Sequence, residues 1–219
     1  MTSLFVTGTD TEVGKTFISV ALIELFKQQG LNVAGMKPIA SGCEQTPAGL
    51  RNEDALALQQ NANVELDYEL INPYAFAPAI APHIAAQQAA TDIEINVLKT
   101  HYQQIQAQAD VVVVEGAGGW LVPLNETDTM ADLASTLNLP VVLVVGIRLG
   151  CINHALLSVE AIKQTGLNLL GWVANDLETS PQAKAMIETL DQHIAAPCLG
   201  VVPQLNSNQS ASSFLSLAK

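Results

Sequence analysis

Short apolar runs alternate with segments of helical periodicity along the whole chain. Six runs rich in valine, leucine and isoleucine predict strands at residues 3–7, 32–36, 111–114, 141–145, 169–174 and 199–202. Between them, the spacing of apolar residues predicts helices at residues 15–29, 53–60, 84–109, 128–137, 152–165, 181–194 and 211–217. Gly30 is placed to close the first helix, and Asn52 to cap the second.

This alternation predicts an α/β fold with a mostly parallel central sheet and helices on both faces. Residues 111–114 and 141–145 are apolar at every position, which is typical of strands buried on both sides. No repeat or linker divides the chain, so residues 1–219 are expected to form a single three-layer domain. In such sheets ligands bind beyond the carboxyl ends of the strands, and these ends are the candidate functional positions.

The first strand end carries a phosphate-loop pattern. Gly8 is followed by five residues and then by Gly14, Lys15 and Thr16, where a helix is predicted to begin. Backbone N–H groups of such a turn bind phosphate, the lysine reaches the terminal phosphates and the hydroxyl ligates Mg²⁺. The common pattern has four residues between the glycines. A chance Gly-Lys-Thr in an ordinary turn is the alternative, but the order of strand, glycines, lysine and helix favours a P-loop NTPase fold.

The next strand ends supply a lysine and carboxylates. Lys37 follows the second strand, where it would either meet an anion on the first loop or be an ordinary surface charge. Glu115 ends an apolar strand, the usual place of the acidic partner of a phosphate loop. Asp54 lies in the first turn of a helix, where acids also serve the helix dipole. Together with Thr16, these two acids would suffice for Mg²⁺ when phosphates supply further ligands.

Two later strand ends are open to more than one interpretation. The segment Gly150, Cys151, Ile152 and Asn153 opens a helix, whose N-terminus can bind a carboxylate or simply connect strand to helix. Asn175 can pair with the donor and acceptor edge of adenine, or can cap a turn.

Composition excludes several classes of partner. The formal net charge is −12 and only nine residues are Lys or Arg, which argues against nucleic acid or an anionic membrane surface. Three scattered cysteines and four histidines show no metal-ligand spacing. The opening residues lack the pattern of a signal peptide and no apolar run approaches membrane-spanning length, so a cytoplasmic protein is expected.

Six segments together resemble the dethiobiotin synthetase family, in the family's order and from the first strand to the last: residues 8–16, 37–42, 50–56, 114–120, 149–155 and 171–176. The five-residue spacing in the phosphate loop is the spacing of that family. The resemblance implies an ATP- and Mg²⁺-dependent cyclo-ligase of biotin biosynthesis. Its substrates would be 7,8-diaminopelargonic acid, carbon dioxide and ATP. A carbamate and a carbamic–phosphoric mixed anhydride would lead to dethiobiotin, ADP and phosphate.

The resemblance also implies roles for individual residues. Lys15 and Lys37 would be catalytic, and Mg²⁺ would be held by Thr16, Asp54 and Glu115. The diamine or its carbamate would be bound by Thr11, Lys37, Ser41, Gly150, Cys151, Ile152 and Asn153. ATP would be bound by Glu12, Val13, Gly14, Lys15, Thr16, Phe17, Asp54, Glu115, Gly116, Ala117, Gly118, Asn175, Asp176, Pro203, Gln204 and Leu205. The family often carries tryptophan in the last segment, where this chain has Gln204.

The family is a homodimer with active sites at the subunit boundary, so Gly150–Asn153 would serve a substrate bound mainly to the other subunit. Two other functions fit the same scaffold: an amidoligase, and a nucleotide-driven switch of the partition-protein class. Partition proteins commonly have a second lysine five positions before the loop lysine, where this chain has Asp10. A degenerate binding module is disfavoured because Lys15, Thr16, Lys37 and Glu115 are all present.

Overall fold

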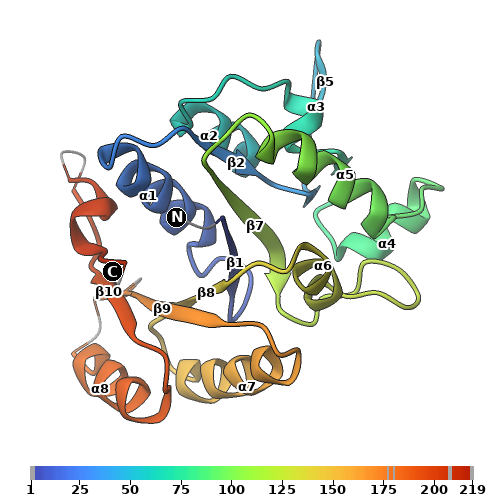
Figure 1. Ribbon diagram of the computed structural model, residues 1–219. Coiled ribbons are helices and arrows are strands. Elements are labelled where there is room, and N and C mark those ends of the chain that lie inside the picture. Colours follow the sequence, from blue (N-terminus) through green and yellow to red (C-terminus); the bar gives the residue numbers. More distant parts are fainter. Residues whose placement is uncertain (1–2, 177, 180, 207–208, 218–219) are drawn as a thin grey trace.

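Six parallel strands form the central sheet of the computed structural model, which describes residues 3–176, 178–179, 181–206 and 209–217. Their order is β10-β9-β8-β1-β7-β2, and every neighbouring pair is parallel. The strands are β1 (Leu4–Gly8), β2 (Val33–Met36), β7 (Val111–Gly119), β8 (Val141–Gly146), β9 (Leu169–Asn175) and β10 (Cys198–Val202). All six predicted strands are confirmed (Figure 1).

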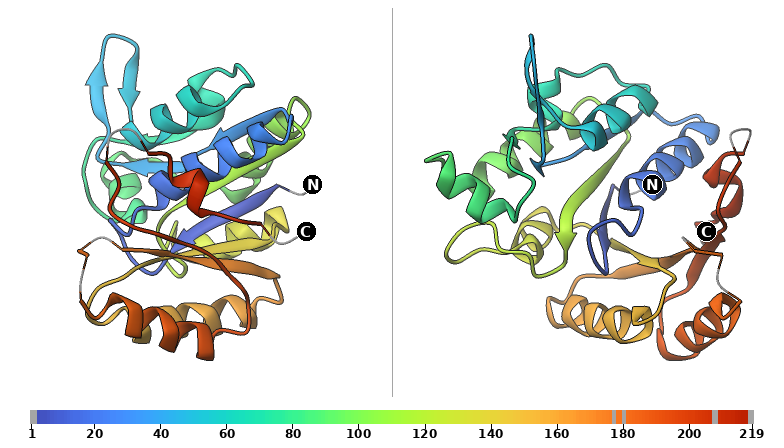
Figure 2. Two further views of the ribbon diagram at one scale, coloured as in Figure 1. Left: turned by 90° about the vertical axis from the view of Figure 1, so that its left-hand side faces the viewer. Right: turned by 180° about the vertical axis from the view of Figure 1, so that it is seen from behind.

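Helices cover both faces of this sheet, as the apolar strands require. Along β1, Leu4 and Val6 enter one core while Phe5 enters the other, because successive side chains point to opposite faces. The first core is covered by α1 (Lys15–Gln28), α2 (Glu53–Asn61) and the short 3₁₀ helix η1 (Ala211–Phe214). The second is covered by α5 (Ile95–Gln106), α6 (Met130–Leu137), α7 (Cys151–Gln164) and α8 (Ala183–His193). The predicted three-layer α/β architecture is therefore confirmed (Figures 1 and 2).

Small elements that the sequence pattern did not predict lie between β2 and α5. Strands β3 (Ile39–Ser41) and β6 (Tyr74–Phe76) pair in parallel, and β4 (Glu44–Thr46) forms a hairpin with β5 (Gly49–Arg51). The hairpin stands out from the body of the molecule (Figure 2). A short helix, α3 (Tyr68–Ile71), precedes β6. Three-residue strands are too short to show an alternating pattern, and the residues of the hairpin are partly or fully exposed. The hydrophobic pattern of the sequence therefore does not predict these strands.

Two predicted helices differ from the structure. The helix expected at residues 84–109 is two helices, α4 (Pro82–Gln88) and α5, because Ala90 adopts the left-handed conformation with φ of 48°. The helix expected at residues 211–217 is the single 3₁₀ turn η1. Strand β7 continues beyond the predicted Val114 to Gly119, so Glu115 lies within the strand.

Helix α2 begins at a hydrogen-bonded cap that also fixes the backbone around Lys37. The Asn52 Oδ1 atom accepts a bond from the Ala55 N–H at 3.2 Å, which confirms the predicted cap. The Asn52 N–H donates to the Tyr68 hydroxyl, which donates to Asn72 Oδ1. The Asn72 side-chain amide donates to the Lys37 carbonyl at 2.7 Å. This buried chain therefore joins the start of α2 to the end of β2.

The variant Asn52→Ala should lower the free energy of unfolding by about 1 kcal/mol, because α2 loses its capping oxygen. Denaturant unfolding in matched buffers would measure the change. Asn52→Asp keeps an acceptor at the same place and serves as the control. Equal stability of the alanine variant and the unmodified protein would contradict the capping role.

Candidate functional site

The turn between β1 and α1 has a backbone conformation that favours glycine. Gly14 has φ of 85°, and a Cβ atom there would lie 2.1 Å from Asn175 Nδ2. Asn175 is buried at the end of β9 and its amide donates to the Val13 carbonyl at 3.0 Å. Glu12 also has a positive φ, of 59°, which is uncommon for a residue with a side chain. The predicted phosphate loop thus forms a tight turn, which is stabilised by the hydrogen bond from Asn175 to Val13.

Lys15 lies at the start of α1 with its ammonium directed to its own loop. Its Nζ donates to the Asp10 carbonyl at 2.8 Å, and the residue is buried. Burial, and next the nearby charge of Lys37, lower the pKa of Lys15 to about 8. An anionic phosphate would offset both effects, because it supplies the opposite charge in a poorly solvated place.

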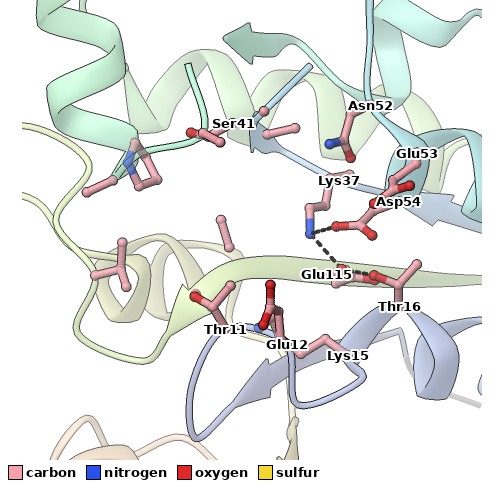
Figure 3. Close-up of a pocket in the computed structure, with 18 of the residues that line it drawn as sticks. Thr11, Glu12, Lys15, Thr16, Lys37, Ser41, Asn52, Glu53, Asp54 and Glu115 are labelled. Carbon is pink, nitrogen blue, oxygen red and sulfur yellow. Dashed lines mark hydrogen bonds and ion pairs between the residues drawn. The ribbon is translucent and has the colours of Figure 1, made fainter. Parts of the chain in front are cut away.

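Lys37 lies at the centre of an ionic cluster (Figure 3). Its Nζ donates to Glu115 Oε1 at 2.6 Å and to Asp54 Oδ2 at 2.9 Å. The Thr16 hydroxyl donates to the same Glu115 oxygen at 2.8 Å. Thr16 follows β1, Glu115 belongs to β7 and Lys37 follows β2, and these three strands are neighbours. The order of strands therefore brings together residues that are far apart in the chain.

The charges in this cluster stabilise one another. Burial opposes the ammonium of Lys37, but Glu115 and Asp54 outweigh it, and the pKa of Lys37 is raised. Burial likewise favours the neutral form of Asp54, but the attraction of Lys37 and the hydrogen bonds from Lys37 and Thr16 lower its pKa. Lys37 and Asp54 are therefore both charged near neutral pH.

The cluster also has the oxygen donors that suit Mg²⁺. Glu115 is fully buried, and its Oε2 atom has no hydrogen-bond partner within the part of the chain that the structure describes. A buried carboxylate oxygen without a partner is costly unless a cation or donor meets it. The hydroxyl of Thr16 and the carboxylates of Asp54 and Glu115 are hard oxygen ligands, which Mg²⁺ prefers. These residues therefore fit the predicted metal.

The cluster opens into a pocket of about 900 Å³ that is lined by both polar and apolar residues. Its polar and charged lining residues include Thr11, Glu12, Lys15 and the cluster itself. Apolar lining residues include Val122 and the stretch 79–82, whose residues are Ala, Ile, Ala and Pro. The predicted residue Ser41 also lines the pocket, and its buried hydroxyl has no partner among the described residues. The pocket can thus hold a molecule with a polar end and a hydrocarbon part.

Not every predicted residue lies in this pocket. The lining includes Gly14, Thr16, Phe17, Ala117 and Gly118, but not the strand-end residues Asn175 and Asp176 or the segment Pro203, Gln204 and Leu205. That segment follows β10, beside β9, and the Thr179 hydroxyl donates to Gln204 Oε1 at 3.4 Å. Val13 is buried beneath the loop, and Gly116 lies within β7.

The residues Gly150, Cys151, Ile152 and Asn153 also lie outside the pocket, at the start of α7. Gly150 has φ of 93°. The Cys151 side chain is buried, with its Sγ 3.8 Å from Met186 Sδ, so only its backbone could meet a ligand. Within one subunit these four residues are not part of the pocket. That they bind a substrate held mainly by a second subunit stays a prediction.

Two parts of the site were missed in the sequence. The apolar lining at residues 79–82 belongs to a proline-rich stretch whose path could not be read from periodicity. The second is an ion pair, in which an Arg148 guanidinium nitrogen lies 2.8 Å from Asp10 Oδ2. It ties the phosphate loop to the segment before α7. The two partners are 138 positions apart in the chain, so no local sequence pattern could predict this ion pair.

Replacing Asn175 with leucine should lower the free energy of unfolding by about 1–3 kcal/mol without nucleotide, because the buried Val13 carbonyl loses its donor. Thermal or denaturant unfolding of nucleotide-free protein would measure this. Gln204→Leu changes an exposed amide in a segment also predicted to bind adenine, and should leave stability nearly unchanged. A stability loss confined to nucleotide-bound protein would contradict the bracing role of Asn175.

Solved structures share the fold. The septum-site-determining protein MinD of Pyrococcus horikoshii, solved with Mg-ADP, matches with a TM-score of 0.58 and 14% identity over 97% of this chain and 86% of that chain. The MinC:MinD cell division complex of Aquifex aeolicus matches with a TM-score of 0.60 and 13% identity, with the same coverage. A family model described as an AAA domain matches residues 2–212. Fold and site together define a P-loop nucleotide-binding protein.

Curated relatives are much closer in sequence. The ATP-dependent dethiobiotin synthetase BioD of Cellvibrio japonicus is 52% identical over 218 residues, which are 98% of this chain and 96% of that protein. The protein of the same name from Pseudomonas aeruginosa UCBPP-PA14 is 53% identical over 207 residues, 94% of this chain and 91% of that protein. The chain belongs to the ATP-dependent dethiobiotin synthetase family, and the predictions of an ATP-dependent ligase and of this family are confirmed.

Among the described residues, no helix combines the length and the apolar character that a membrane span needs.

Proposed function

We propose that the protein catalyses the ATP- and Mg²⁺-dependent carboxylation and ring closure of 7,8-diaminopelargonic acid with carbon dioxide. The products are dethiobiotin, ADP and phosphate, and the reaction serves biotin biosynthesis in the cytoplasm. The observation that carries the proposal is one pocket that is lined by apolar residues and in which five side chains converge: Lys15, Lys37, Thr16, Asp54 and Glu115. A phosphate donor and a hydrocarbon diamine can both be accommodated there.

The reaction begins at one amine of the substrate. Its nitrogen attacks carbon dioxide and loses a proton, which gives a carbamate. A carbamate oxygen then attacks the γ-phosphorus of ATP and ADP leaves, giving the carbamic–phosphoric mixed anhydride. The second amine attacks the carbamoyl carbon, phosphate leaves and the ureido ring closes with loss of a proton. Neither lysine needs to form a covalent bond in this sequence.

The lysines act by charge and position. Carbamate and triphosphate are both anionic, so they repel each other unless positive charge lies between them. Lys15 from the phosphate loop and Lys37 from the end of β2 supply that positive charge. It stabilises the negative charge that shifts between the phosphates and the carbamate during phosphoryl transfer. Thr16, Asp54 and Glu115 would hold Mg²⁺, which neutralises phosphate charge when bound.

The two ends of the diamine would be bound in different ways. Thr11, Lys37 and Ser41 lie on the pocket wall and would bind the amines or the carbamate. The hydrocarbon chain would pack against residues 79–82 and Val122. In a homodimer, the substrate carboxylate would meet the α7 N-terminus, residues 150–153, of the partner subunit.

The nucleotide would extend from the phosphate loop toward β9 and β10. Its phosphates would lie on the loop from Glu12 to Phe17, and its base near Asn175, Asp176 and the Pro203–Leu205 segment. Asn175 Nδ2 is engaged by Val13, so the Oδ1 atom is the one that would accept a bond from the adenine amino group.

The test is ATP turnover by purified protein with Mg²⁺ and bicarbonate, with and without 7,8-diaminopelargonic acid, and with mass spectrometry of the product. Diamine-dependent ADP release with formation of dethiobiotin is the expected result. ATP hydrolysis that ignores the diamine would instead indicate a switch of the partition-protein class. Activity with a different amine and none with this one would indicate an amidoligase.

A further inference from the structure

The ammonium of Lys37 lies among the same side chains that are proposed to hold Mg²⁺. It contacts Glu115 Oε1 at 2.6 Å, Asp54 Oδ2 at 2.9 Å and the Gly116 carbonyl at 3.4 Å. The Thr16 hydroxyl shares the Glu115 oxygen. Figure 3 shows the Lys37 ammonium pointing toward both carboxylates. One ammonium therefore contacts both acids of the proposed metal site.

We propose that Lys37 is an exchangeable internal counter-ion of this site. Its ammonium pairs with Asp54 and Glu115 in the nucleotide-free protein and moves off them when a divalent cation binds with the nucleotide. The released ammonium then reaches the substrate. This inference rests on the proposed function, because it takes Asp54 and Glu115 as the metal-binding acids.

The physical reason is repulsion between two cations at one pair of acids. A divalent ion held by both carboxylates would lie close to the present position of Nζ, and burial leaves little water to screen the charges, since Lys37 is 4% and Glu115 0% exposed. Glu115 belongs to β7, which is paired on both sides, and its side chain is fully buried, so it has little room to withdraw. Lys37 has a flexible stem and lines the open pocket, so Lys37 is the residue that can move.

The exchange predicts an order of events. A divalent cation alone must compete with an ammonium that is already hydrogen-bonded to two acids, so it should bind weakly. With nucleotide, the phosphates supply further ligands to the cation and further negative charge to Lys37 and Lys15, so the exchange becomes favourable. The lysine that serves the carbamate would thus become available only after the metal–nucleotide complex is in place.

The experiment is Mn²⁺ binding to nucleotide-free protein, with free Mn²⁺ measured by electron paramagnetic resonance. Lys37→Met should bind Mn²⁺ at least tenfold more tightly than the unmodified protein. Lys15→Met is the matched control: it removes the same charge from the same pocket, but Lys15 Nζ is bonded to the Asp10 carbonyl and not to the acids. Its affinity should change less than threefold. No tightening in Lys37→Met, or equal tightening in both variants, would overturn the proposal.

A second measurement covers the case in which Lys37→Met does not fold. In protein labelled with ¹⁵N-lysine, the Lys37 Nζ resonance can be assigned by its absence in the charge-preserving Lys37→Arg variant. Mg²⁺ with a non-hydrolysable ATP analogue should shift this resonance strongly, whereas Mg²⁺ alone should not. An unchanged resonance would overturn the exchange. Neither assay contains diamine or depends on turnover, so failure here is distinguishable from failure of the dethiobiotin assay.

Discussion

Lys37→Gln is expected to reduce kcat by roughly 10²–10³-fold, because a buried positive charge beside two anionic reactants is lost. In Mg²⁺-free buffer the variant should remain folded but lose about 3 kcal/mol of unfolding free energy, since Asp54 and Glu115 lose their ion-pair partner. Steady-state kinetics and denaturant unfolding measure the two effects separately.

The control for this variant is Lys163→Gln, which changes the same charge on an exposed side chain of α7. It should affect neither turnover nor stability appreciably. Near-normal turnover by Lys37→Gln would remove Lys37 from the proposed mechanism. A loss of turnover matched by loss of folded protein would assign the effect to structure instead.

Glu115→Gln is expected to raise the Mg²⁺ concentration needed for half-maximal turnover by at least about tenfold. The reason is that a neutral amide replaces a fully buried carboxylate whose Oε2 has no partner among the described residues. A Mg²⁺ titration of turnover at saturating ATP measures the change.

Glu53→Gln provides the comparison for Glu115→Gln. Glu53 lines the same pocket but is exposed at the start of α2, so its variant should have a nearly normal Mg²⁺ titration. If the two variants titrate alike, Glu115 is not a metal ligand and only the total charge of the pocket matters.

The fold and the centre of the site could be predicted because their signals are local. The glycines around Lys15 and each apolar strand occupy short continuous segments, so they can be recognised directly in the sequence. The rule that strand ends share one edge then placed Lys37 and Glu115 near the phosphate loop. The structure brings these residues within hydrogen-bonding distance of one another or of common partners.

The remaining parts depend on contacts that no local pattern contains. The β4–β5 hairpin is made of exposed or half-exposed three-residue strands, and the break at Ala90 lies in an otherwise helical composition. The Arg148–Asp10 pair exists only because β8 lies beside β1. The buried bond from Asn175 to Val13 likewise requires the loop and the end of β9 to meet, which the sequence could not specify.

The order of strands has a consequence for how binding arises during synthesis. Strands β1 and β2 follow each other in the chain but do not pair, because β7 is inserted between them. An N-terminal fragment that stops short of residue 119 therefore contains Lys15 and Lys37 but not the complete strand that separates them and carries Glu115. Nucleotide binding should be absent from such fragments. Because Asn175 at the end of β9 also holds the loop and β8 pairs with β1, binding should appear only after β7, β8 and β9 have all left the ribosome. These later strands, and not the loop sequence alone, therefore decide when the protein can bind nucleotide.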